Sequence, residues 1–175
     1  MEKQRSRNVA LGGLLSALGW LILLLTLVLP TGRIFLLTLA SFLVVVAWGE
    51  LSPVFAVVVY GAISALGMIY PGLYPTALFI LFFGTAPLIS LFLTRYLKGL
   101  RLWLARHAIL TALMAASVAA IGLHTLIKGP AGISSGWIWL VLIVLFQGFL
   151  VAYEYLLRAF THIWVERIRP GTTFR

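Results

Sequence analysis

Long apolar runs alternate along the whole chain with short segments rich in proline, glycine or charge. The first run, Val9 to Leu29, carries no charge, and its length of about twenty residues is what a helix needs to cross a bilayer core of roughly 30 Å. Runs of this kind predict six membrane-spanning helices, at about 9–29, 34–49, 53–70, 75–94, 108–127 and 136–158. The pattern therefore predicts an all-α integral membrane protein, built as a six-transmembrane-helix bundle.

Two local patterns refine this prediction. Ser52 followed by Pro53 is typical of a helix N-cap with proline at the first helical position. The segment 95–107 interrupts the apolar pattern, because its cations fall on one side of a helix and its apolar and aromatic residues on the other. These cations are Arg95, Lys98, Arg101 and Arg106. Such a segment is typical of an amphipathic helix lying in the membrane interface.

Composition supports a membrane protein throughout. The 175 residues are 62% hydrophobic and 10% charged, whereas charged residues make up about a quarter of a soluble domain. We therefore expect one membrane domain over 1–175, without a separate soluble domain. The chain has no cysteine, which excludes disulfides and thiolate metal sites.

The net charge of +9 follows the expected topology. With six spans, eleven of the 13 Lys and Arg residues fall on the side of the two termini, and only Arg33 and Lys128 fall on the other. This bias predicts that the N and C termini are cytoplasmic and that the inner surface contacts anionic lipid. The predicted location is the plasma membrane of a prokaryotic cell, as a multi-pass protein. A nucleic-acid partner is not expected.

Small residues gather on one side of the first span. Gly12 and Ser16, and likewise Gly13 and Ala17, are spaced four apart, which lets a second helix approach closely in a membrane. One interpretation is packing against helices of the same chain. The other is docking of a separate membrane subunit, for which Ala10, Gly13 and Ala17 are the candidate residues.

The polar residues do not form a catalytic arrangement. The acids are Glu2, Glu50, Glu154 and Glu166, and the histidines are His107, His124 and His162. No paired carboxylates, Ser-His arrangement or phosphate-binding loop occurs among them, so we expect neither an enzyme nor a cofactor. Glu154, Arg158, His162 and Glu166 follow at four-residue spacing, which favours ion pairs between helical turns over a metal site.

The predicted outer ends of the helices hold the candidate ligand site. Its residues are aromatic or basic, and they are Arg33, Tyr70, Tyr74, His124, Lys128, Trp137 and Trp139. A mostly apolar site with a few polar groups is typical of small-molecule binding. No acid is expected at these outer ends, which favours a neutral aromatic or anionic ligand over a cation. The alternative is an ordinary interfacial aromatic belt. Gln147 is added as a ligand contact, with an interhelical hydrogen bond as the alternative.

The chain resembles the substrate-binding S component of energy-coupling-factor (ECF) vitamin transporters. The resemblance rests on the six-span architecture and on the basic leader that runs into RNVALGGLLSALGWLI. Gly13 to Ala17 stands where that family has a small-xxx-small motif. The resemblance implies capture of a vitamin or related micronutrient near the outer ends of the helices, beneath the connection Pro30 to Arg33. It also implies docking of the first helix on a transmembrane coupling subunit, with two cytoplasmic ATPases as the source of energy.

Two other readings stay open. The rod-shape-determining membrane protein MreD resembles this architecture in size and helix count, which would make the chain a non-catalytic scaffold. A third interpretation is a lone facilitator or an accessory subunit of a larger membrane complex. A packed outer end favours the scaffold, and a lined outer cavity favours solute capture.

Overall fold

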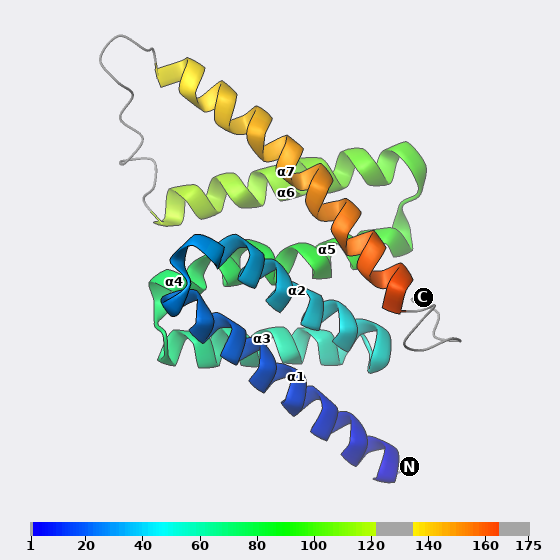
Figure 1. Ribbon diagram of the computed structural model, residues 1–175. Helices are drawn as coiled ribbons and strands as arrows, with labels where there is room; N and C mark the ends of the chain where they lie inside the picture. Colours follow the sequence, from blue (N-terminus) through cyan, green and yellow to red (C-terminus); the bar gives the residue numbers. More distant parts are fainter. Residues whose placement is uncertain (1, 122–134, 165–175) are drawn as a thin grey trace.

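The computed structural model describes residues 2–121 and 135–164. Within these ranges the chain is helical and contains no strand. The elements are α1 (Glu2–Val28), η1 (Pro30–Gly32), α2 (Arg33–Glu50), α3 (Pro53–Ile69), α4 (Leu73–Leu78), η2 (Phe79–Phe83), α5 (Thr85–Tyr96), α6 (Gly99–Ile121) and α7 (Ser135–Ile163) (Figure 1). The all-α prediction is confirmed for this part of the chain.

Four described helical stretches are long and apolar enough to cross a membrane. They are Ser6–Val28, Arg33–Glu50, Thr76–Tyr96 and Ile143–Ile163. The apolar helix α3, Pro53–Ile69, is shorter than these four. The structure thus supports a membrane protein with four candidate spans among the residues it describes.

The first three helices form a tightly packed unit. α1 packs against α2 and α3, and α2 packs against α3. Ser52 begins α3 as predicted, because its hydroxyl accepts a hydrogen bond from the Phe55 amide at 3.3 Å and Pro53 takes the first helical position. At the other end, the short turn η1 reverses the chain from α1 into α2.

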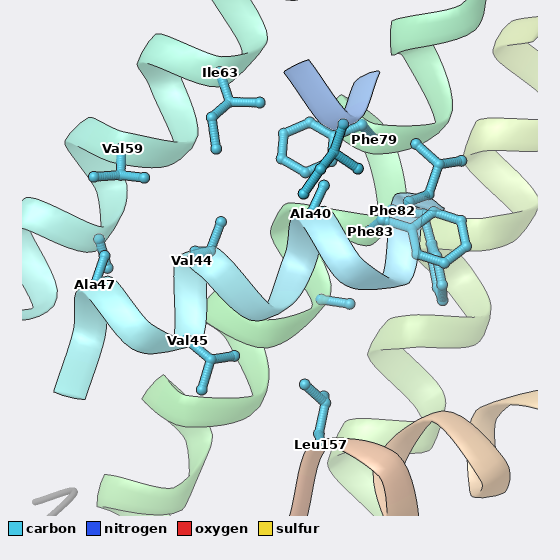
Figure 2. Packing of buried hydrophobic residues seen from close by; sticks show 14 of the residues in the cluster. Ala40, Val44, Val45, Ala47, Val59, Ile63, Phe79, Phe82, Phe83 and Leu157 are labelled. Carbon is cyan, nitrogen blue, oxygen red and sulfur yellow. The ribbon is translucent and has the colours of Figure 1, made fainter. Parts of the chain in front are cut away.

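α2 lies at the centre of the apolar core. Figure 2 shows Ala40 and Val44 on the side of α2 that faces α3 and Phe79, and Val45 on the side that faces Leu157 of α7. All of these residues are buried. The small side chains of α2 therefore allow close neighbours on both of its sides.

The fourth apolar run is not a single regular helix. α4 passes into the π-helical turn η2, and α5 follows after Gly84. Two side chains donate hydrogen bonds to the Ile80 carbonyl: the Tyr60 hydroxyl at 2.9 Å and the Thr85 hydroxyl at 2.6 Å. A β-carbon at Gly84 would lie 2.6 Å from the Tyr60 ring, so glycine permits this close approach of α3.

The basic segment 95–107 is organised differently from the predicted interfacial helix. α5 ends at Tyr96, and α6 starts at Gly99, with a positive φ of 59°, and continues to Ile121. Because the chain turns between the two helices, the cations before and after the turn do not share one helix face. Arg101 is exposed, whereas Arg106 is buried. The prediction that Arg106 lies on the polar face is therefore wrong.

α7 runs obliquely across α6 and α5 (Figure 1). Most of its large apolar side chains between Leu140 and Leu156 are exposed, as expected for a lipid-facing surface. Its C-terminal end meets α2 through Phe160, whose ring stacks on Phe42 with 4.5 Å between centroids. Trp164, which follows α7, donates from Nε1 to the Glu50 carboxylate of α2 at 3.0 Å. α7 is thus a peripheral helix with a few specific attachments.

Candidate functional site

The small-residue side of α1 divides into two sets. Gly12, Ser16 and Gly19 are buried. A β-carbon at Gly12 would lie 3.8 Å from side chains of α3 and from Leu51, which connects α2 to α3. A β-carbon at Gly19 would overlap Ile63 of α3. The Ser16 hydroxyl is satisfied within α1 by the Gly12 carbonyl at 2.8 Å. This set packs against the chain's own α3.

The second set lies on the exposed part of the same helix. Ala10, Gly13 and Ala17 are all exposed, and a β-carbon at Gly13 would meet no described atom within 4 Å. These are the three residues that the sequence predicts for docking. In the described structure, the first set is therefore used for packing within the chain, and the second set is exposed.

Two residues of the predicted outer site lie beside the C-terminal half of α1. Arg33 is half-buried, and its Nε donates to the Thr26 carbonyl at 3.3 Å, where a cation also complements the negative end of the α1 dipole. The Tyr70 ring is exposed, and its carbonyl accepts a hydrogen bond from Trp20 Nε1 at 2.7 Å. The η1 turn and the α3–α4 turn lie at the same end of the molecule (Figure 1).

The other predicted outer residues are described in part or not at all. Tyr74 lies in α4, and Trp137 and Trp139 lie in the first turns of α7, but their side chains fall outside the described residues. His124 and Lys128 also lie outside them. No described hydrogen bond joins Arg33 to Tyr70. The outer site remains a prediction from the sequence.

Gln147 belongs to the contact between α6 and α7. Its Oε1 lies 3.2 Å from His107 Nδ1, and its Nε2 donates to Thr111 Oγ1 at 2.7 Å. Both partners belong to α6, so Gln147 forms the interhelical bonds that were the alternative to a ligand contact. Polar side chains commonly join membrane helices in this way.

Sequence reasoning missed a buried charge cluster in the same contact. Arg106 Nη1 lies 3.3 Å from Glu154 Oε2, and the side chains are 8% and 9% exposed, respectively. Arg158 Nη2 lies 3.4 Å from the same oxygen, as its spacing of four predicts, but it is 70% exposed. Arg106 Nε, Glu154 Oε1 and His107 Nε2 are buried and have no hydrogen-bond partner in the described structure.

One sequence signal could have pointed to this cluster. Gln147 and Glu154 are seven residues apart, which places them two turns apart on one face of α7. An apolar helix with two strongly polar residues on one face needs polar partners on its neighbour. Arg106 and His107 are the residues that supply them.

A further contact between a cation and an aromatic ring joins the C-terminal ends of α2 and α5. The Arg95 guanidinium lies over the Trp48 ring, 5.1 Å from its centroid. Among the described residues, no group of three or more His, Cys, Asp or Glu side chains could hold a metal ion.

Comparisons of the chain with protein-family models, with curated proteins and with solved structures find no match.

Proposed function

We propose that the chain is the substrate-capture subunit of an ATP-driven ECF importer. In this role it binds a vitamin or related small micronutrient at its outer side and docks through α1 on a transmembrane coupling subunit, which two cytoplasmic ATPases energise. The proposal assumes six spans, cytoplasmic termini and a prokaryotic plasma membrane. The Lys and Arg bias toward one side supports this orientation, in which those residues face anionic lipid head groups.

The observation that carries the proposal is the division of the small residues on α1. Packing within the chain accounts for Gly12 and Gly19, since side chains of α3 close over both. It does not account for Ala10, Gly13 and Ala17, which are exposed on the same helix. An exposed set of small residues at helical spacing suits the close approach of a helix from another subunit.

The ligand site of the proposal lies at the outer end. Arg33 and Tyr70 flank the C-terminal half of α1 there. Tyr74, His124, Lys128, Trp137 and Trp139 complete the set by sequence position. Aromatic rings with a few cations suit a neutral aromatic or an anionic compound.

The second candidate is a non-catalytic scaffold of the MreD type. Its support is the closed aromatic contact between η2 and α7, where Phe82 and Phe83 are buried. Phe82 contacts the rings of Phe146, Phe149 and Tyr153 at centroid distances between 5.7 and 6.4 Å. A solid interior of this kind supports a scaffold, in which the exposed small residues of α1 would hold another protein.

Replacing Gly13 with leucine is expected to weaken docking on the coupling subunit. A bulky side chain in a close helix contact costs about 1–3 kcal/mol, which is roughly 5–150-fold in the association constant. The measurement is the amount of coupling subunit that co-purifies with the tagged chain after co-expression. Gly61→Leu is the matched control, because Gly61 of α3 is also exposed and also has open space around it. Equal co-purification of the two variants would exclude docking at Gly13.

Replacing Trp137 with alanine is expected to weaken ligand binding without affecting docking. Loss of an aromatic anchor from a small-molecule site costs about 2 kcal/mol, or roughly 30-fold in affinity. Native mass spectrometry of the purified chain would identify the co-purifying compound, and titration of the variant with that compound would give the change. Trp103→Ala, at an exposed position of α6, is the control. An unchanged affinity would place the ligand elsewhere, and a chain that carries no small molecule favours the scaffold.

A further inference from the structure

An exposed apolar stripe runs along α7 and ends at an arginine. Val144, Gly148, Val151 and Tyr155 follow one another at spacings of three and four residues, which places them on one face of the helix. All four are exposed, and Arg158, three residues further along the chain, continues the same face and is exposed too. A β-carbon at Gly148 would meet no described atom within 4 Å. The described structure therefore leaves this face of α7 open.

The length of this stripe matches one leaflet of a bilayer. It belongs to the candidate span Ile143–Ile163. At about 1.5 Å per residue, the stretch from Val144 to Tyr155 is roughly 16 Å long, and half of a hydrocarbon core is about 15 Å. Tyr155, next to the arginine, is of the aromatic type that is enriched at the boundary between lipid and water. Arg158 thus lies where the headgroup of a phospholipid would lie if its acyl chain followed the stripe.

Arg158 belongs to a cluster with an excess of positive charge. Its Nη2 and Arg106 Nη1 contact the same oxygen of Glu154, at 3.4 and 3.3 Å, respectively. One carboxylate is thus shared by two guanidinium groups. Arg106 Nε and Glu154 Oε1 are buried and have no described partner. A guanidinium carries five N–H donors, so the exposed Arg158 retains donors for a second anion.

The neighbouring segments add cations but no further acid. In the polar contacts between α6 and α7, the α6 residue numbers fall as the α7 residue numbers rise, so the start of α6 lies toward the Arg158 end of the contact. Arg101 in α6 and Lys98 just before it are exposed. Among the described helices α5, α6 and α7, Glu154 is the only acid. The charge around this end of α7 therefore favours an anionic partner.

We propose that this face of α7 binds one anionic phospholipid. Arg158 holds the phosphate, and an acyl chain lies along the stripe from Val144 to Tyr155. An arginine suits a phosphate because the planar guanidinium can donate two parallel hydrogen bonds to it. The apolar stripe favours a lipid over a soluble phosphate compound, since only the lipid covers it. The site is one defined place, beyond the general attraction of basic residues to anionic lipid, and it is independent of solute capture.

Native mass spectrometry of the full chain in detergent would measure the binding. The chain is titrated with phosphatidylglycerol and, separately, with phosphatidylcholine that carries the same acyl chains. We expect the first phosphatidylglycerol to bind about fivefold more tightly, which is the contribution of one cation near an anionic lipid. Arg158→Ala should remove this preference, and excess glycerol 3-phosphate should not displace the lipid. Equal affinity of the parent chain for both lipids would overturn the proposal, and so would displacement by glycerol 3-phosphate.

Arg7→Ala is the matched control, because it removes the same charge from an exposed position on α1. This variant should keep the preference for phosphatidylglycerol. If Arg7→Ala and Arg158→Ala lose the preference equally, the effect comes from net charge, and the site on α7 is excluded.

Photo-crosslinking would locate the lipid without any substitution. The full chain is placed in phosphatidylcholine nanodiscs that contain phosphatidylglycerol with a photoreactive acyl chain. After illumination and digestion, the crosslinks should concentrate between Val144 and Tyr155. Val57 and Val58 on α3, which are also exposed and apolar, give the background of unselective contact. Crosslinks spread evenly over α3 and α7 would contradict the site, as would crosslinks on α7 that are equally frequent with a photoreactive phosphatidylcholine.

Discussion

Replacing Glu154 with alanine should lower the free energy of unfolding by about 3–5 kcal/mol, because removal of one member of a buried ion pair leaves the other charge uncompensated. The charge left behind is Arg106, whose side chain is 8% exposed. The loss would be measured by reversible unfolding in mixed micelles, with increasing denaturing detergent and helicity as the readout.

The matched control removes the other cation on the same carboxylate. Arg158 is 70% exposed, and exposed pairs of this spacing contribute only about 0.3–0.5 kcal/mol. Arg158→Ala should therefore have little effect. The double variant Arg106→Met/Glu154→Leu should recover most of the stability lost in Glu154→Ala, since apolar residues of similar volume often replace a buried pair without loss. Equal losses for Glu154→Ala and Arg158→Ala would contradict the buried pair.

The substitutions Gly67→Ala and Gly61→Ala should change stability in opposite directions, although both lie on α3. A β-carbon at Gly67 would lie 2.6 Å from Thr76 Cγ2 and 2.9 Å from Thr76 Oγ1. Overpacking of this kind costs about 1–3 kcal/mol. It would also disturb the hydrogen bond that Thr76 Oγ1 donates to the Gly67 carbonyl at 2.9 Å.

Gly61 has open space around it, so alanine there should only reduce the freedom of the unfolded chain and add about 0.5–1 kcal/mol. The same gain at Gly67 offsets only part of its steric cost. Thermal denaturation of both variants in one detergent gives the comparison. A stabilising effect at both positions would mean that α3 and α4 are not in close contact at Gly67.

How much of the fold could be predicted depended on whether the stabilising contacts join residues that are near or far apart in the sequence. The apolar runs predicted the helical segments, and Ser52 followed by Pro53 predicted the start of α3. Both predictions depend only on residues that are close together in the sequence. The π-helical turn η2 could not be predicted in this way. It is stabilised by Tyr60, which lies twenty residues before Ile80 in the chain.

Arg106 illustrates why the predicted amphipathic helix over 95–107 was wrong. The predicted amphipathic face assumed one continuous helix through 95–107, and the turn before Gly99 breaks that continuity. The burial of Arg106 also depends on Glu154, which lies far along the chain on another helix. For α1, the sequence indicated the small side and the three candidate docking residues, but not that Gly12, Ser16 and Gly19 are buried. The burial of Gly12 and Gly19 depends on where Leu51 and the side chains of α3 pack against α1.

The division of α1 has a consequence for natural variation among related chains. Gly12 and Gly19 are constrained by the fold itself, so they should stay small in every homologue, whatever its role. Gly13 and Ala17 are free of that constraint, and under the proposed docking role they should stay small only in lineages that retain a docking subunit. A lineage that lost such a subunit would be recognised by bulky residues at 13 and 17 beside unchanged residues at 12 and 19.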